Sequence, residues 1–534
     1  MAGSTQGKPN AEQVKVIKHE AGPMLVVAGA GTGKTRVIVE RINRLIKEGT
    51  SPKRILALTF TEKAAAEMLD RANELAGSYL LDLPIMTFNA FGESLLRRYG
   101  ADVGLSRNFV LMGDSAQIVF MQEHLDELKL DYFAPVSRPD SLLGTLSDYF
   151  SKLKQLVITP EVFSKFTVSM PVGDDAEKLE KAKQKELAGA YQTYLELCAK
   201  NSVIDYDDQI YRVIELFKKR PNVLRAVQES YDYVMVDEFQ DTNLMQSMLV
   251  DMLVGKKQNL LVVGDDDQSI YGFRGATLAN ILDFKKRYPK SKEVTLIENY
   301  RSTKEILEST YRLIQANSPN RLEDRLKINK RLKTVRSGAK PLRHVFEKLD
   351  EELRWIASDI QNRIKSGTPA GDIAVFARRN QTVRRLSAVL TSENIDHVVA
   401  GQRYELYHEP IVRTLLEALK TVVDPENSVS LFHILTGPLF NISPSSLTTA
   451  LSQSRQEHES LKKVLDESPD KGIKPALELI EAWREASGLS SVGQLSYQIL
   501  DSSGLKRTLF EDAKNDATAA TSVIRLNELF NTKK

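Results

Sequence analysis

Short apolar runs alternate with longer stretches in which apolar side chains recur at helical spacing. The apolar runs span residues 24–28, 55–60, 84–88, 233–236, 260–264 and 294–297. Continuously apolar strands separated by helices are typical of a parallel sheet that is covered by helices on both faces. The pattern therefore predicts an α/β fold, in which ligands bind beyond the carboxyl ends of the strands.

The strand pattern is interrupted once by a long helical stretch and later gives way to helices altogether. A candidate strand at residues 372–376 indicates that a second α/β unit follows the first one. We expect a first sheet domain in two parts (1–104 and 201–285), a helical insertion between them (105–200), a second α/β unit (286–382) and a mainly helical region (383–534).

The first apolar run leads directly into a glycine-rich turn that ends in Lys34 and Thr35. Glycines let consecutive backbone N–H groups face a phosphate, while the lysine reaches the β- and γ-phosphate oxygens and the threonine hydroxyl binds Mg²⁺ at a helix N-terminus. Ala28 stands where the general motif has glycine, which narrows the families that fit. The alternative is a fortuitous glycine-rich turn. The predicted ATP-binding residues of this segment are Ala28, Gly29, Ala30, Gly31, Thr32, Gly33, Lys34, Thr35 and Arg36.

Two adjacent carboxylates, Asp237 and Glu238, follow the apolar run 233–236. Asp237 is suited to hold Mg²⁺ there, and Glu238 is suited to orient and deprotonate a water that attacks a phosphate. Acidic residues are also common at solvated strand ends. The phosphate-binding loop upstream favours the catalytic interpretation.

The run 260–264 is followed by three aspartates and then by Gln268, Tyr271, Phe273 and Arg274. The Gln268 amide could sense a γ-phosphate, and the two aromatic rings offer faces on which unpaired bases stack. The alternatives are a Ca²⁺ site or a packed turn, but the aspartates lack the remaining ligand spacing of an EF-hand, which disfavours Ca²⁺. We therefore predict that this loop contacts both nucleotide and nucleic acid.

Composition narrows the class of protein only in part. The formal net charge is +2, so overall charge neither requires nor excludes a nucleic-acid partner. The chain has a single cysteine, Cys198, and no apolar signal segment at its N-terminus, so we expect a cytoplasmic protein without a membrane partner. The seven histidines and the cysteine lack metal-ligand spacing, so no structural zinc is predicted.

Taken in order along the chain, these motifs resemble those of superfamily 1A DNA helicases of the UvrD, Rep and PcrA type. The matching segments are residues 10–13, 28–35, 59–68, 87–91, 205–208, 263–276 and 296–302. The resemblance also accounts for Ala28, because the family's own phosphate-binding loop lacks the first glycine. It implies a P-loop NTPase of RecA-like fold with a helical insertion, followed by an incomplete second RecA-like domain and a helical domain.

The resemblance implies roles for further residues. Gln13 would read the adenine edge, Tyr300 would stack on adenine, and Arg301 would contact the γ-phosphate as a finger from a second domain. With Lys34, Asp237, Glu238 and Gln268, Arg301 completes the predicted catalytic set. Asn89 stands where the family usually has histidine. The predicted DNA contacts are Phe60, Thr61, Phe88, Asn89, Tyr271, Phe273 and Arg274.

The implied activity is ATP- and Mg²⁺-dependent 3′→5′ translocation on single-stranded DNA and at single-strand/duplex junctions, with strand separation in DNA repair or recombination. Two motifs that complete the family's second sheet domain are not recognisable, so the rival prediction is an ATP-regulated DNA-binding or assembly subunit that needs a second polypeptide. A small-molecule kinase would leave Tyr300 and Arg301 unexplained. Stacking and phosphate contacts do not by themselves distinguish DNA from RNA.

A basic stretch at residues 325–336 has two interpretations. Such a run is usually a solvated face, but it could also follow the phosphates of a nucleic acid, which would give salt-dependent binding without sequence preference. Both interpretations remain open from the sequence.

Overall fold

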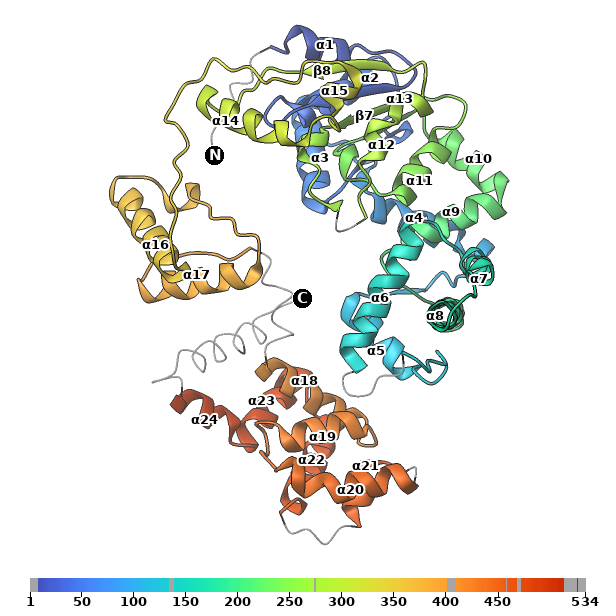
Figure 1. Ribbon diagram of the computed structural model, residues 1–534, viewed down its shortest axis with the longest axis vertical. Coiled ribbons are helices and arrows are strands. Elements are labelled where there is room, and N and C mark those ends of the chain that lie inside the picture. The colour runs from blue at the N-terminus through green and yellow to red at the C-terminus, as the bar shows by residue number, and fades with distance from the viewer. Residues whose placement is uncertain are drawn as a thin grey trace. The chain divides into compact units, whose positions relative to one another are not determined.

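The computed structural model describes residues 8–133, 139–272, 275–400, 410–457, 459–467, 472–512 and 526 of the 534-residue chain (Figure 1). The chain divides into two compact units, Met1–Arg343 and His344–Lys534. Each unit has its own hydrophobic cores and is described by itself. The finer division into five parts stays a prediction.

The first unit is built on a six-stranded sheet in which every neighbouring pair of strands is parallel. Its strand order is β3-β2-β6-β7-β1-β8. The strands are β1 (Met24–Ala28), β2 (Ile55–Thr59), β3 (Ile85–Thr87), β6 (Tyr233–Val236), β7 (Leu260–Gly264) and β8 (Lys292–Leu296). Each lies within two residues of a predicted apolar run, so the predicted parallel α/β fold is confirmed.

The two faces of this sheet are covered by separate hydrophobic cores, because successive strand residues point to opposite faces. Leu25 and Val27 belong to one core, whereas Met24 and Val26 belong to the other. The second core also receives α1 (Ala11–Ile17), α2 (Lys34–Lys47) and α3 (Glu62–Ala76). The first core receives α4 (Phe88–Tyr99), α9 (Asp208–Lys219), α10 (Pro221–Ser230), α11 (Leu244–Val254), α12 (Ala279–Leu282), α13 (Phe284–Arg287) and α15 (Leu322–Leu326).

Strand β8 corrects one expectation about the sheet. Its sequence is the predicted start of a second α/β unit, but it pairs with β1 in the first sheet, where Val294 lies opposite Val26. The helix that follows it is α14 (Lys304–Ile314). The first sheet therefore has one more strand than the predicted boundary at residue 286 allows.

The strand predicted at 372–376 is not formed in the second unit. A short 3₁₀ turn, Ala370–Asp372, is followed by irregular backbone in which the Phe376 side chain is 94% exposed. A strand needs a neighbour that accepts and donates its backbone hydrogen bonds, and none pairs with this segment among the described residues. Beside it, α16 (Leu349–Lys365) and α17 (Asn380–Ser392) share a small apolar core.

The residues that the structure describes between 410 and 512 are mainly helical. Their helices surround one core that includes Trp483, which is fully buried. They are α18 (Pro410–Val423), α19 (Ser428–Thr436), α20 (Pro444–Glu457), α21 (Leu461–Asp466), α22 (Lys474–Ser487), α23 (Val492–Ser502) and α24 (Leu505–Asp512). Among the described residues of either unit, no helix is long and apolar enough to cross a membrane.

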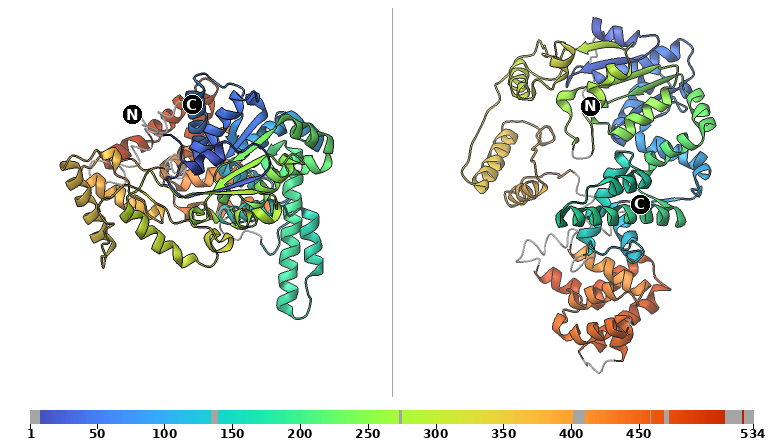
Figure 2. Two further views of the ribbon diagram at one scale, coloured as in Figure 1. Left: turned by 90° about the horizontal axis from the view of Figure 1, so that it is seen from above. Right: turned by 45° about the vertical axis from the view of Figure 1, so that its right-hand side comes forward.

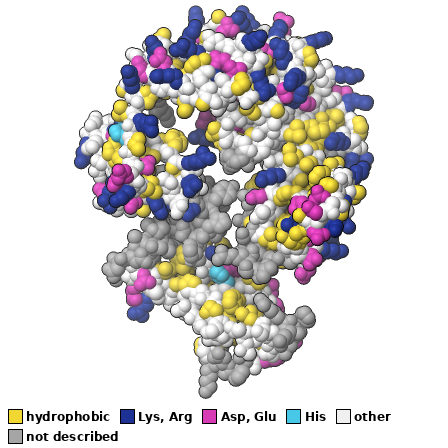
Figure 3. Space-filling model, in the orientation of Figure 1, with side chains coloured by type: hydrophobic (Ala, Val, Ile, Leu, Met, Phe, Trp, Pro, Cys, Tyr) yellow, Lys and Arg dark blue, Asp and Glu magenta, His cyan; other side chains and the backbone are white. Residues whose placement is uncertain are grey.

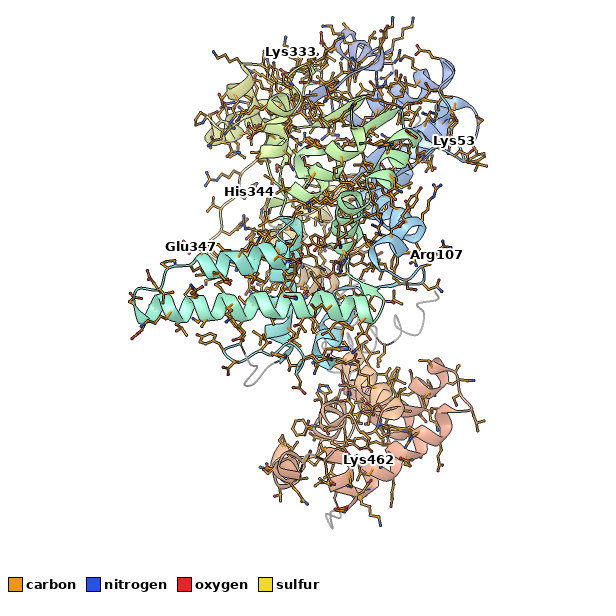
Figure 4. All side chains as sticks on the ribbon, turned by 90° about the vertical axis from the view of Figure 1, so that its right-hand side faces the viewer. Lys53, Arg107, Lys333, His344, Glu347 and Lys462 are labelled. Carbon is orange, nitrogen blue, oxygen red and sulfur yellow. The ribbon has the colours of Figure 1, made fainter. Side chains whose placement is uncertain are left out.

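The insertion between β3 and β6 has its own apolar core. Helices α7 and α8 lie side by side in it and form a hairpin that extends from the sheet domain (Figures 2 and 4). Its elements are β4 (Val110–Leu111), α5 (Asp114–Glu123), α6 (Pro139–Gln155), α7 (Pro160–Ser169), α8 (Asp175–Lys200) and β5 (Val203–Ile204), and β4 pairs with β5 in a parallel two-stranded sheet.

A buried ion cluster fastens the insertion to the sheet domain. The Lys154 ammonium on α6 contacts the Asp205 carboxylate and lies 3.0 Å from the Asp208 carboxylate at the start of α9. The Lys154 side chain has no exposed surface. Burial alone would lower the pKa of Lys154, but the attraction of the two carboxylates outweighs it and raises that pKa above its usual value.

Replacing Lys154 with methionine should destabilise this junction by about 3–5 kcal/mol, because two buried carboxylates lose their counter-charge. Both tryptophans, Trp355 and Trp483, lie in the second unit, so tryptophan fluorescence would not report the loss of stability at the junction. Amide hydrogen exchange of α6 and α9 would measure it. The exposed Lys152 on the same helix provides the matched control, Lys152→Met. Unchanged exchange protection in Lys154→Met would contradict the assignment.

Candidate nucleotide and nucleic-acid site

The glycine-rich turn connects β1 to α2 at the carboxyl edge of the sheet. Ala28 is the last residue of β1, fully buried and paired with Leu296, so an ordinary strand conformation suffices there. Gly31 (φ 72°) and Gly33 (φ 92°) adopt left-handed conformations that disfavour any side chain. Helix α2 begins at Lys34, and its first turn holds Thr35 and Arg36, which pairs with Glu40 at 2.6 Å. This geometry fits a loop whose N–H groups surround a phosphate.

The Lys34 ammonium joins the two other catalytic segments that the sequence predicts. Its Nζ atom donates to Glu238 Oε2 at 2.7 Å and to Gln268 Oε1 at 3.0 Å. Glu238 follows β6, and Gln268 follows β7, so three strand ends converge on one ammonium group. The structure thus brings together residues that are more than two hundred positions apart.

The two carboxylates after β6 differ in environment. Asp237 is buried, and burial together with the nearby Glu238 charge raises the pKa of Asp237 to about 7, although the Lys34 charge acts against this. A buried carboxyl with a raised pKa fits a site for a divalent cation, because the cation would stabilise the charged form of the carboxyl. Glu238 has a left-handed backbone (φ 50°), and its carboxylate turns towards Lys34 and also accepts from the Gln240 amide at 2.9 Å.

Gln13, predicted to read adenine, supports the phosphate-binding loop directly. It is buried, and its Nε2 atom donates to the Thr32 carbonyl oxygen at 3.0 Å. Its Oε1 atom accepts from the backbone N–H of Asn10, which caps α1. A role in adenine recognition stays a prediction, but the contact with Thr32 is a structural role that the sequence did not indicate.

The segment after β8 packs onto the same loop. Asn299 Nδ2 donates to the Ala30 carbonyl at 2.5 Å, and the Tyr300 backbone N–H donates to the Gly31 carbonyl at 3.0 Å. The Tyr300 hydroxyl accepts from Asn10 Nδ2 at 2.9 Å, so this half-exposed ring lies beside the start of α1. Arg301 follows with an exposed side chain. Tyr300 and Arg301 therefore lie next to the predicted nucleotide site, and their roles stay predictions. The prediction that Arg301 comes from a second domain is wrong, because Arg301 follows a strand of the first sheet and belongs to the first unit.

Two of the predicted base-stacking rings lie together. The Phe60 and Tyr271 ring centroids are 5.0 Å apart, with an angle of 35° between the planes. Phe60 follows β2, which neighbours β6 in the sheet, and Tyr271 lies three positions after Gln268, so Tyr271 shares a loop with a predicted catalytic residue. Phe273 and Arg274, which were also predicted to contact DNA, lie outside the described residues.

The structure corrects the prediction for Phe88. Its side chain is 2% exposed and belongs to the core beneath the sheet, because Phe88 begins α4 on the side that faces that core. It cannot reach a nucleic acid from there. Asn89 is half-buried and donates to the Tyr206 carbonyl at 3.3 Å, whereas Thr61 is exposed and caps α3 through the Ala64 N–H. DNA contacts by Asn89 and Thr61 stay predictions.

The three aspartates after β7 surround a lysine from the basic stretch. Lys330 Nζ lies 2.6 Å from Asp265 and 2.8 Å from Asp267, and it also contacts Asp266. The Lys330 side chain is 4% exposed, so it cannot follow the phosphates of a nucleic acid. Lys333 of the same stretch lies at the surface (Figure 4). The two interpretations of the stretch therefore apply only to its exposed residues.

One face of the first unit carries charged side chains of both signs (Figure 3). On the face drawn in Figure 3, Lys and Arg side chains are spread among acidic and apolar ones. This agrees with the small net charge of the whole chain. The paired rings of Phe60 and Tyr271 are thus a more specific indication of nucleic-acid binding than the distribution of charge.

Comparison with known proteins agrees with this geometry. The model of the UvrD/REP helicase N-terminal domain matches residues 9–289, and the model of the UvrD-like helicase C-terminal domain matches residues 294–525. The chain belongs to the UvrD/Rep helicase family. This is a family of ATP-hydrolysing DNA helicases, and the match extends the similarity well beyond the last motif recognised in the sequence.

Two curated relatives have the same printed name, "ATP-dependent DNA helicase PcrA". The protein from Staphylococcus epidermidis is 31% identical over 98% of this chain and 70% of its own length. The protein from Staphylococcus aureus is 31% identical over 94% of this chain and 66% of its own length. The chain thus spans about two thirds of the length of the relatives that it matches.

Replacing Tyr271 with alanine should weaken binding of single-stranded DNA by about 1–3 kcal/mol, because one stacking face is lost. ATP binding should not change, and Tyr271→Phe should bind DNA as the wild type does, since it keeps the ring. Tyr79→Ala is the matched control, because Tyr79 is 84% exposed in the same unit. Fluorescence anisotropy of a labelled oligonucleotide measures both effects. Wild-type affinity in Tyr271→Ala would contradict the stacking role.

Proposed function

We propose that this protein is an ATP-dependent DNA helicase that moves along single-stranded DNA in the 3′→5′ direction and separates strands at single-strand/duplex junctions. The family membership supports the reaction class, and the relatives named as ATP-dependent DNA helicases support DNA as the substrate. The 3′→5′ direction and a role in DNA repair or recombination are our inference from the family resemblance alone.

One observation supports the proposal best. The loop after β7 carries Gln268, which accepts from Lys34 at 3.0 Å, and Tyr271, which lies against Phe60. A change at the γ-phosphate would move Gln268, and Tyr271 is only three residues further along the backbone. Hydrolysis of ATP would therefore change the position of a ring that holds a base, which is the coupling that a translocase needs.

We expect the groups needed for phosphoryl transfer to come from the predicted site residues. The loop N–H groups and Lys34 would bind the phosphates, and release of Lys34 from Glu238 would free that carboxylate to orient and deprotonate the attacking water. The exposed Arg301 would neutralise charge that develops on the transferred group. Thr35 and Asp237 would hold Mg²⁺, which offsets the negative charge of the phosphates when it is bound.

The test is Mg²⁺-dependent ATP hydrolysis with and without single-stranded DNA, and with RNA of the same sequence. We expect strong stimulation by DNA. Lys34→Ala should weaken ATP binding, whereas Glu238→Gln should keep ATP binding but slow hydrolysis roughly 10²- to 10⁴-fold, because it removes the base. Displacement of streptavidin from the 3′ or 5′ end of an oligonucleotide would determine the direction.

Two results would contradict the proposal. Binding of ATP and DNA without hydrolysis would instead indicate a regulated binding or assembly subunit. Stimulation by RNA alone would indicate a different substrate. Faster displacement from the 3′ end than from the 5′ end would reverse the proposed direction but leave the translocase activity intact.

A further inference from the structure

Lys330 is a buried cation that none of the recognised motifs includes. It lies among the carboxylates of Asp265, Asp266 and Asp267, each of which has one oxygen atom within 4.8 Å of such an atom of the other two. Burial alone would lower the pKa of Lys330, but the attraction of the three aspartates raises it above its usual value. The ammonium group thus occupies the position that a metal ion would take in such a cluster, and it neutralises charges that would otherwise repel one another.

A second buried cation holds the same segment in place. Arg321 donates to both Asp267 oxygens at 2.8 Å, and it also donates to Glu323 at 2.6 Å. Glu323 in turn accepts from the Lys330 backbone N–H at 3.2 Å. The Asp266 carboxylate accepts from the Leu322 backbone N–H at 2.7 Å. The segment from Arg321 to Lys330 is therefore fixed to the acidic loop by several charge-assisted hydrogen bonds.

A continuous path of hydrogen bonds leads from Lys330 to the candidate catalytic centre. Asp265 contacts Lys330 through Oδ1 and accepts from Gln268 Nε2 through Oδ2 at 2.6 Å. Gln268 then presents its Oε1 atom to Lys34. Because an amide has one acceptor end and one donor end, the bonds with Asp265 and with Lys34 favour the same orientation of the Gln268 side chain. If the bond with Asp265 is lost, only the bond with Lys34 still holds the amide in this orientation.

The chain just after this segment contacts the residues that follow β8. Lys333 exchanges backbone hydrogen bonds with Ile297 and Asn299, at 2.8 and 2.7 Å. A cavity of about 300 Å³ is lined by Gly29, Ala30, Gln268 and Lys330 together. Lys330 is therefore adjacent to the phosphate-binding loop, although it lies too deep to contact DNA.

We propose that Lys330 is a positioning residue for ATP hydrolysis, which holds Asp265 so that the Gln268 amide presents its oxygen to Lys34 and responds to the γ-phosphate. This inference rests on the proposed function. It gives one residue of the basic stretch a role in ATP hydrolysis. The stretch would otherwise be interpreted as a solvated face or a phosphate contact. Lys330 acts through Asp265 and Gln268 and does not touch the substrate.

The test is a double-mutant cycle between Lys330→Met and Gln268→Ala in the 534-residue chain, with DNA-stimulated kcat and the Kd for ATP as readouts. We expect Lys330→Met to lower kcat roughly 10- to 100-fold, because it disturbs the charge-assisted hydrogen bond between Asp265 and Gln268. The Kd for ATP should change little. In the Gln268→Ala background the same substitution should have almost no further effect. Lys290→Met, at an exposed lysine before β8, is the matched control.

Asp265→Ala is a second variant in case Lys330→Met fails to fold, because Lys330 keeps two carboxylate partners in it. It should reproduce the loss of kcat, and retained ATP binding shows that the first unit is folded. An equal loss of kcat from Lys330→Met in both backgrounds, or no loss at all, would overturn the inference while leaving the proposed function intact. A wild-type chain without hydrolysis would overturn both.

Discussion

The nucleotide site depends on a single ammonium group that is shared between two strand ends. Lys34 lies at the start of α2 and holds Glu238 and Gln268 at hydrogen-bond distance. Because the three residues follow β1, β6 and β7, their convergence requires the parallel order of these strands in the sheet. The cores on both faces fix that order, so the fold and the geometry of the site are determined together.

Contacts of the phosphate-binding loop and of the loop after β7 support the proposed coupling of ATP and DNA. Asn299 and Tyr300 bind the carbonyl groups of the phosphate-binding loop. In addition, Gln268 and Tyr271 lie three positions apart in one loop. A γ-phosphate that engages Lys34 would replace the bonds that Lys34 makes to protein groups. Both Glu238 and Gln268 would then be released at the same step.

Much of this arrangement is predictable from the sequence, because its signals are local. The apolar runs predict the strands, and the glycines, Lys34 and the Asp237–Glu238 pair follow them directly. Phe88 is different, because the sequence shows an aromatic residue in a motif but does not show the direction of its side chain. Only the packing of α4 on the sheet reveals that Phe88 points into the core.

Non-local contacts account for what the sequence does not predict. Lys330 belongs to a run of basic residues that resembles a solvated face, and its three partners lie more than sixty residues earlier. Charge pattern alone cannot show such a pairing. The strand expected at 372–376 fails for a related reason, because strand formation depends on a neighbour elsewhere in the chain. The comparisons, in contrast, extend the family resemblance to residue 525.

We infer that the nucleotide state determines how the Tyr271 loop holds DNA. The most direct measurement is the Kd for single-stranded DNA in the presence of a non-hydrolysable ATP analogue and in the presence of ADP, for the wild type and for Gln268→Ala. We expect the two states of the wild type to differ roughly 5- to 150-fold in Kd, which is a common range for coupling between sites, and we expect the variant to lose this difference. Equal affinities in both states of the wild type would contradict this inference.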